Sequence, residues 1–273
     1  MSDVFGLDAY APKEVAARVT EVGVAKARLP WLTQALLGVL AGAFIGLGAV
    51  MFTLVASDAS LGFAAQRLLG GLVFSLGLVL VTVAGAELFT GNNLIVMAWA
   101  AGQVSASALL RNWAVVCAAN LVGAAGLALL VALADTALMN QGAVGRTLLS
   151  IAQAKVDMPA TQAFFRGVLC NVLVCMAVWM AMAGRTVTDK AVAIVFPITA
   201  FVAAGFEHSI ANMFFFAFAA LTHAPIGFGA MLVNLAVVIA GNVVGGSVLV
   251  ALAYWVIFLR PGRSPQGAGR PGP

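Results

Sequence analysis

Six long apolar runs constrain this chain more than any other feature of its sequence. They cover about Trp31–Val55, Leu68–Ala101, Arg111–Ala134, Gln162–Ala183, Ala191–Leu221 and Met231–Leu259. Each run is long enough to cross the hydrocarbon core of a bilayer as a helix, which takes about 20 residues. None alternates apolar and polar residues with the period of two that marks the strands of a membrane barrel. The sequence therefore predicts an all-α membrane protein with six transmembrane helices.

The composition excludes a soluble protein. Only 9% of the residues are charged and 63% are hydrophobic, whereas soluble domains carry roughly 25% charged residues. The net charge of +4 comes from scattered basic residues, so we expect a lipid bilayer and not a nucleic acid as partner. The three cysteines, Cys117, Cys170 and Cys175, lie within apolar runs. We interpret them as small core residues and not as disulfides or metal ligands.

Polar segments flank the six runs and divide the chain into three parts. Residues 1–30 place three valines on one helical face, which predicts an amphipathic helix at the cytoplasmic surface of the membrane. No signal-peptide pattern precedes the first run. Residues 31–259 form the predicted transmembrane pore domain. Residues 260–273 are more than half proline and glycine, which predicts a disordered tail.

The distribution of basic residues predicts the topology. An even number of spans places both ends of the chain on one side of the membrane, and ten of the 14 lysines and arginines then lie on that side. The other side carries Arg67, Arg146, Lys155 and Arg166. Because loops rich in lysine and arginine stay in the cytoplasm, we expect both termini to be cytoplasmic and the protein to lie in the inner membrane.

The second and fifth runs are each too long for one plain span and contain polar residues in the middle. Gly85–Asn92 and Gly205–Asn212 carry glycine, glutamate and asparagine at matching positions, 120 residues apart. We therefore expect both helices to be broken at these segments. New helix N-termini should begin near Asn92 and near Asn212.

The matching segments also indicate an internal duplication. Asn120–Gly123 resembles Asn242–Gly245, and Gly42–Gly46 is matched with Gly167–Asn171. Each copy contains three spans, an odd number, so the second copy must enter the membrane from the opposite side. Broken helices at equivalent positions of inverted repeats are a recurrent design for a substrate path near the midplane. The pattern predicts a transport function.

Glu87 and Glu207 are the only acidic residues within the runs. An ionised carboxylate near the bilayer centre costs about 2.5–3.5 kcal/mol on insertion scales, so something must stabilise each one. A broken helix frees several backbone N–H groups, and we expect each glutamate to accept from the groups of its own break. Direct contact with an anionic substrate is disfavoured, since the fixed negative charge would repel it.

His208, beside Glu207, is the only histidine within the runs, at a point where irregular backbone should line a cavity. Helix N-termini favour anions, so together with an imidazole they predict a site for a small anion or weak acid. Ser209, Thr90 and Asn171 can add hydrogen-bond donors. His223 and Lys155, judged from their surroundings in the sequence alone, are expected to be exposed loop residues.

Enzyme motifs are absent from the sequence. It contains no HExxH, CxxC, GxSxG or Walker pattern, and a single histidine within the runs disfavours a haem anchor, so we expect neither catalysis nor a cofactor. A channel for neutral solutes of the aquaporin type remains an alternative, although the chain lacks paired Asn-Pro-Ala motifs.

Three segments carry a resemblance to a known family. The stretches GAELFTGNN from Gly85, GVLCNVLVCMAVWMA from Gly167 and GFEHSIANMF from Gly205 resemble the formate/nitrite transporters, and the likeness extends from about Glu14 to Leu259. Within that family the sequence is most similar to the formate channels. Many of the same residues occur in the nitrite transporters.

The resemblance implies an aquaporin-like six-helix protomer, with the second and fifth helices broken, assembled as a homopentamer with one pore in each protomer. It implies transport of a small monovalent anion, formate in the first place and nitrite as the alternative, by a channel or together with protons. The substrate pathway that it implies contains the central histidine His208, with Thr90, Asn171 and an anion-attracting Lys155. The apolar constrictions that it implies are Phe74, Leu78, Leu88 and Phe201.

Overall fold

The computed structural model describes residues 9–260, and every regular element in that part of the chain is helical. The sequence expectations for residues 1–8 and for the tail 261–273 lie outside the described residues. Six helices within residues 9–260 are long and apolar enough to cross a membrane, which confirms the predicted number of spans. They are Trp31–Ala56, Phe63–Ala84, Ala106–Leu133, Ala160–Ala183, Val187–Ala204 and Phe228–Phe258.

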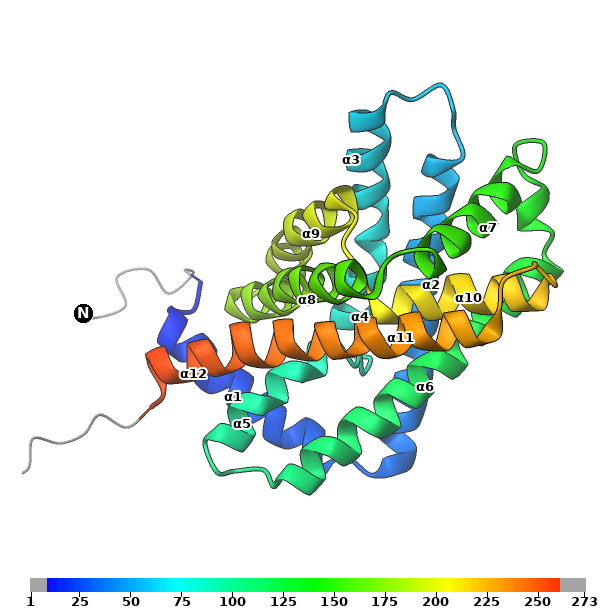
Figure 1. Cartoon of the computed structure of the whole chain (residues 1–273). Helices are drawn as coiled ribbons and strands as arrows, with labels where there is room; N and C mark the ends of the chain where they lie inside the picture. Colours follow the sequence, from blue (N-terminus) through cyan, green and yellow to red (C-terminus); the bar gives the residue numbers. More distant parts are fainter. Residues whose placement is uncertain (1–8, 261–273) are drawn as a thin grey trace, which may run out of the picture.

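The chain runs through two comparable series of elements (Figure 1). The first comprises α1 (Pro12–Arg28), α2 (Trp31–Ala56), α3 (Phe63–Phe74), α4 (Leu76–Ala84), the 3₁₀ turn η1 (Gly91–Ile95), α5 (Val96–Ala100) and α6 (Ala106–Leu133). The second comprises η2 (Thr136–Leu138), α7 (Ala143–Val156), α8 (Ala160–Ala183), α9 (Val187–Ala204), α10 (Ser209–Leu221), α11 (Phe228–Val243), the π-helical segment η3 (Val244–Leu252) and α12 (Ala253–Phe258).

The second and fifth spans are interrupted as predicted. Helix α4 ends at Ala84, and Gly85 follows with φ of 84°; α9 ends at Ala204, and Gly205 follows with φ of 73°. Glycine adopts this left-handed conformation without the steric cost that a Cβ brings. The chain then continues without helix until η1 and α10 begin. Each break leaves its polar segment inside the helical bundle.

Glycines allow the closest helix pairs to form. Helix α2 packs along α6, and α8 packs along α11. A Cβ on Gly123 of α6 would collide with the carbonyl oxygen of Val39 in α2, and a Cβ on Gly245 would collide with that of Val168 in α8. Because glycine has no side chain, the backbones of the paired helices can approach closely and pack directly against each other. Helix α10 joins the two halves, because it packs against both α2 and α6.

Helix α1 covers one end of the bundle. Its residues Val15 and Val19 are buried, in a cluster with Leu94 and Ile95 of η1. The apolar face expected at a membrane surface therefore packs largely on the protein itself. Helix α1 also contacts α12, so both ends of the described chain lie at the same end of the molecule (Figure 1), as an even number of spans requires.

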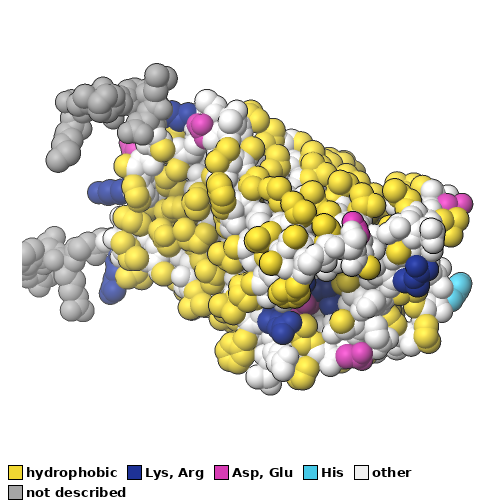
Figure 2. Space-filling view, turned by 90° about the horizontal axis from the view of Figure 1, so that it is seen from above, with side chains coloured by type: hydrophobic (Ala, Val, Ile, Leu, Met, Phe, Trp, Pro, Cys, Tyr) yellow, Lys and Arg dark blue, Asp and Glu magenta, His cyan; other side chains and the backbone are white. Residues whose placement is uncertain are grey.

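The outer surface fits a lipid environment. Large apolar side chains such as Leu130, Phe196 and Val233 are more than half exposed. On the face that Figure 2 shows, hydrophobic side chains cover a broad middle zone and charged side chains gather towards its ends. In water such a surface would associate, because soluble monomers rarely expose contiguous apolar patches of this kind.

Candidate functional site

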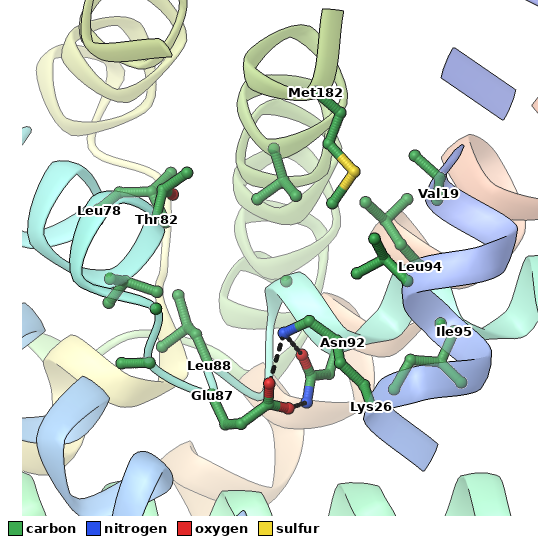
Figure 3. A pocket seen from close by; sticks show the side chains of 17 residues that line it. Val19, Lys26, Leu78, Thr82, Glu87, Leu88, Asn92, Leu94, Ile95 and Met182 are labelled. Carbon is green, nitrogen blue, oxygen red and sulfur yellow. Dashed lines mark hydrogen bonds and ion pairs between the residues drawn. The ribbon is translucent and has the colours of Figure 1, made fainter. Parts of the chain in front are cut away.

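At the first break, Glu87 is held by a lysine and an asparagine (Figure 3). The Lys26 ammonium, at the end of α1, donates to Glu87 Oε1 at 2.7 Å and to Asn92 Oδ1 at 3.0 Å. The Asn92 amide donates to Glu87 Oε2 at 2.7 Å. The three side chains close a ring of charge-assisted hydrogen bonds, which are stronger than neutral ones.

The second break has an equivalent lysine, glutamate and asparagine, although within residues 9–260 its lysine ammonium donates to the glutamate alone. The Lys155 ammonium, near the end of α7, donates to both oxygens of Glu207 at 2.8 and 3.0 Å, and the Asn212 amide donates to Glu207 Oε2 at 2.7 Å. The Lys155 side chain is 12% exposed, against 25% for Lys26. The interpretation of Lys155 as an exposed loop residue is therefore wrong, since it belongs to a helix and is largely buried.

The expectation that each glutamate accepts from freed backbone N–H groups is also wrong. Among the described residues, the hydrogen bonds to both carboxylates come from lysine and asparagine side chains. A charged donor balances the carboxylate as well as bonding to it, which neutral amides cannot do. The backbone N–H groups of Glu87 and Glu207 instead donate to the carbonyls of Leu37 and Arg166.

A second asparagine pair connects the breaks to the helices behind them. Asn120 of α6 donates to the carbonyls of Gly38 and Glu87 and accepts from the N–H of Phe89. Asn242 makes the equivalent bonds, to the carbonyls of Gly167 and Glu207 and from the N–H of Ser209. At the breaks these amides satisfy the carbonyls of Glu87 and Glu207, and through Gly38 and Gly167 they tie each break to a neighbouring helix.

The matching bonds define which residues of the two halves are equivalent. They pair Gly38 with Gly167 and Lys26 with Lys155, both 129 residues apart. Matching Gly42 with Gly167 was therefore wrong by one helical turn, and each repeat begins with the helix before its first span. The inverted orientation of the second copy stays a prediction, which follows from the odd number of spans in each copy.

His208 caps the helix that follows the second break. It is 3% exposed, and its Nδ1 accepts from the N–H of Ala211 at 3.2 Å. A backbone N–H can donate only to an unprotonated nitrogen. The contact with Ala211 therefore requires a neutral ring that carries its proton on Nε2. The Nε2 lies 3.2 Å from the hydroxyl of Thr90, and the ring stacks on Phe201 with centroids 5.8 Å apart.

Asn171 lies behind Thr90. Its amide nitrogen lies within hydrogen-bonding distance of the carbonyl of Thr90, the side chain of Asn93 and the carbonyl of Asn242, at 2.7–3.2 Å. Asn171 thus joins the loop of the first break to the last span. It holds the Thr90 segment through the Thr90 carbonyl, while the Thr90 hydroxyl faces His208. The glycine at position 246 leaves room for this amide, because a Cβ there would collide with it.

Two vestibules lie on either side of these groups. One, of about 240 Å³, is lined by α1 and the first break, including Lys26, Glu87, Leu78 and Leu88 (Figure 3). The other, of about 230 Å³, is lined by residues around the second break, including Phe74, Phe201 and His208. His223 is exposed in the loop after α10, as expected.

A narrow void lies between the two vestibules and shares lining residues with each of them. It has no room for a water-sized sphere, and it is bounded by apolar side chains and His208. Leu78 and Leu88 separate it from the first vestibule, and Phe74 and Phe201 separate it from the second. The two phenylalanines meet edge to face, with centroids 5.6 Å apart. The four residues that the resemblance singled out thus all line this one void.

The family model described as formate/nitrite transporter matches residues 13–256. The chain belongs to the formate/nitrite transporter family. It is 40% identical to the formate channel FocA of Escherichia coli K12, over 93% of this chain and 96% of FocA. It is 36% identical to the nitrite transporter NirC of Salmonella typhimurium LT2, over 88% of this chain and 87% of NirC.

Solved structures agree with this membership. A structure titled "Pentameric formate channel with formate bound" superimposes with a TM-score of 0.76 at 38% identity, over 84% of this chain and 98% of that one. Another, titled "FNT family ion channel", has a TM-score of 0.80 at 32% identity, over 89% and 98%. The formate/nitrite transporter relatives are channels and transporters, in agreement with the expectation of a transporter and not an enzyme.

Sequence reasoning missed several residues that support the two helix breaks. Lys26 and the asparagines at 120 and 242 were not recognised as support for the helix breaks. A signal was present, because Lys26 and Lys155 each stand four residues before a proline that precedes a span, Pro30 and Pro159. Their carboxylate partners lie 61 and 52 residues away along the chain, beyond the reach of local patterns.

Proposed function

We propose that this member of the formate/nitrite transporter family carries a small monovalent anion, formate in the first place, through the passage that connects the two vestibules. The observation that carries the proposal is the position of His208, which borders both the second vestibule and the apolar void and faces Thr90. The path therefore offers an anion hydrogen-bond donors at the point where it is narrowest and driest.

The mechanism follows from the cost of moving charge through that void. An ionised carboxylate without polar partners is expensive to bury, whereas its neutral acid is much cheaper. The Nε2–H of His208 and the Thr90 hydroxyl can hold the anion at the edge of the void, where it takes up a proton from the solution that fills the second vestibule. Leu78 and Leu88 on one side and Phe74 and Phe201 on the other form the constrictions. Asn171 keeps the Thr90 segment in position.

The surroundings of the protein belong to the same proposal. The relative FocA is a channel of the bacterium Escherichia coli. The basic residues of this chain gather on the side that carries both termini, which supports an inner-membrane protein with cytoplasmic ends. A homopentamer is supported by the solved pentameric formate channel to which the chain is similar.

We expect formate uptake by the wild type to increase as the external pH falls, because a proton accompanies the anion. Replacing His208 by asparagine should flatten this pH profile, since the amide can donate a hydrogen bond but cannot relay a proton. The measurement is initial formate uptake into proteoliposomes between pH 5 and pH 8. The control is His223→Asn, which changes an exposed loop histidine. An unchanged profile in His208→Asn would remove His208 from the mechanism.

Nitrite is the second candidate, because the nitrite transporter NirC is 36% identical over most of this chain. Nitrite and formate are both small monovalent anions of weak acids, so the same donors and apolar constrictions suit both. Uptake of the two anions should be compared side by side in the same proteoliposomes. We expect formate to be taken up faster at equal concentration. Faster uptake of nitrite would reverse the assignment.

A further inference from the structure

The vestibule at the second break contains more positive than negative side chains. Its lining includes Arg67, Lys155 and Arg166, and a single acid, Glu207. Lys155 contacts both oxygens of Glu207 at 2.8 and 3.0 Å, so these two charges offset one another. The charge that remains to act on an anion in this vestibule is that of the two arginines.

Both guanidinium groups are held beside Gly205. Arg67 of α3 donates to the carbonyls of Ala203 at 2.8 Å and of Val202 at 2.9 Å. Arg166 of α8 donates to the carbonyl of Gly205 at 3.4 Å. A Cβ placed on Gly205 would lie 2.8 Å from Nη2 of Arg67 and 4.0 Å from Nη1 of Arg166. Two cations from different helices therefore flank one point at the rim of the cavity.

The two arginines retain donors for a ligand. A guanidinium carries five N–H groups, and the bonds above use two on Arg67 and one on Arg166. Within residues 9–260, the ion pairs are Lys26–Glu87 and Lys155–Glu207, so no carboxylate of that part of the chain neutralises either arginine. The positive charge of both groups is therefore available to attract a small oxyanion.

The opposite vestibule differs in charge. Lys26 and Glu87 are the only ionisable side chains among its lining residues, and they form an ion pair at 2.7 Å. The two vestibules therefore have similar volumes and equivalent lysine–glutamate pairs. An unpaired positive charge is present at one of them alone.

We propose that Arg67 and Arg166 form an anion-capture site for small monovalent oxyanions at the mouth of the second vestibule. The site rests on the proposed transport function and deepens it, because His208 lines the inner end of the same cavity. The arginines raise the local anion concentration at this mouth, while Lys155 serves mainly to hold Glu207. Entry from this side then saturates at lower concentration than entry from the side of α1.

The test is initial uptake of labelled formate into membrane vesicles of both orientations, from a host without formate or nitrite transporters of its own. Arg166→Gln is compared with the wild type, with Arg166→Lys, which keeps the charge, and with Arg146→Gln. Arg146 is a matched control. It is an exposed arginine that, like Arg166, donates to one backbone carbonyl, that of Gln141, and it does not line this vestibule.

We expect Arg166→Gln to raise the half-saturating formate concentration about two- to fivefold at low ionic strength. This is the usual size of effect when one partly exposed charge is removed. The maximal rate should not change. The shift should appear only where the second vestibule faces outward, and it should vanish near 1 M salt, where the Debye length is about 3 Å. Arg166→Lys and Arg146→Gln should stay close to the wild type.

Unchanged half-saturation in Arg166→Gln, an equal shift in Arg146→Gln or an equal shift in both orientations would overturn the capture site while leaving formate transport intact. If the wild type takes up neither formate nor nitrite, the proposed function itself fails and the capture site fails with it.

Discussion

Replacing Lys155 by methionine should destabilise the protein by about 3–5 kcal/mol, the usual cost of leaving one partner of a buried ion pair without the other. The Glu207 carboxylate, 5% exposed, would then keep only the Asn212 amide as a partner. Lys26→Met should cost less, because the Lys26 side chain is twice as exposed and water can take over part of its role. The measurement is the denaturant midpoint of unfolding in detergent.

Two further variants make this comparison decisive. Lys13→Met removes an exposed lysine from the first turn of α1 and should leave the midpoint nearly unchanged. The double variant Lys155→Met with Glu207→Gln removes both buried charges and should recover part of the lost stability. A larger loss in Lys26→Met than in Lys155→Met would contradict the assignment of the second ion pair as the more buried one.

Replacing Gly123 by alanine should be comparably damaging, although it adds one methyl group. The added Cβ collides with the Val39 carbonyl, and a carbonyl in a helix backbone cannot move aside as a side chain can. Helices α2 and α6 would have to separate, so we expect a loss of about 3 kcal/mol, near the upper end for overpacking. The unfolding midpoint in detergent again gives the measurement.

The matched control lies in the same helix. Gly126 is three residues further along α6, and a Cβ there meets nothing within 4 Å. Gly126→Ala should therefore stabilise the protein slightly, by up to about 1 kcal/mol from helix propensity alone. The two substitutions make the same chemical change and should have opposite signs. Equal effects at positions 123 and 126 would mean that α2 and α6 do not pack through Gly123.

The spans and the breaks could be predicted because they depend on local properties. An apolar run of more than 20 residues has few solutions in a bilayer other than a helix. The duplicated Gly-Glu-Asn segments are conspicuous in runs that otherwise contain no acid. The glutamates were therefore recognised correctly as residues that need partners.

The partners themselves could not be predicted in the same way. Lys26 and Asn120 reach Glu87 from helices that are distant in the sequence, and hydropathy says nothing about which helices touch. For Lys155, the composition of the neighbouring residues suggested a polar loop, whereas the residue ends a helix equivalent to α1. The contribution of Arg166 depends on the charges that remain once the lysine is paired, which requires the three-dimensional contacts.

The closeness of α2 and α6 has a consequence for the order in which the protein is made. Both helices of this pair belong to the first half of the chain, which is complete once residue 133 has been synthesised. The corresponding pair of the second half, α8 and α11, is likewise contained within that half. We therefore expect each half to be able to form its tightest helix pair as it leaves the ribosome. The two halves then dock where α10 packs against α2 and α6, and where α9 packs against α3.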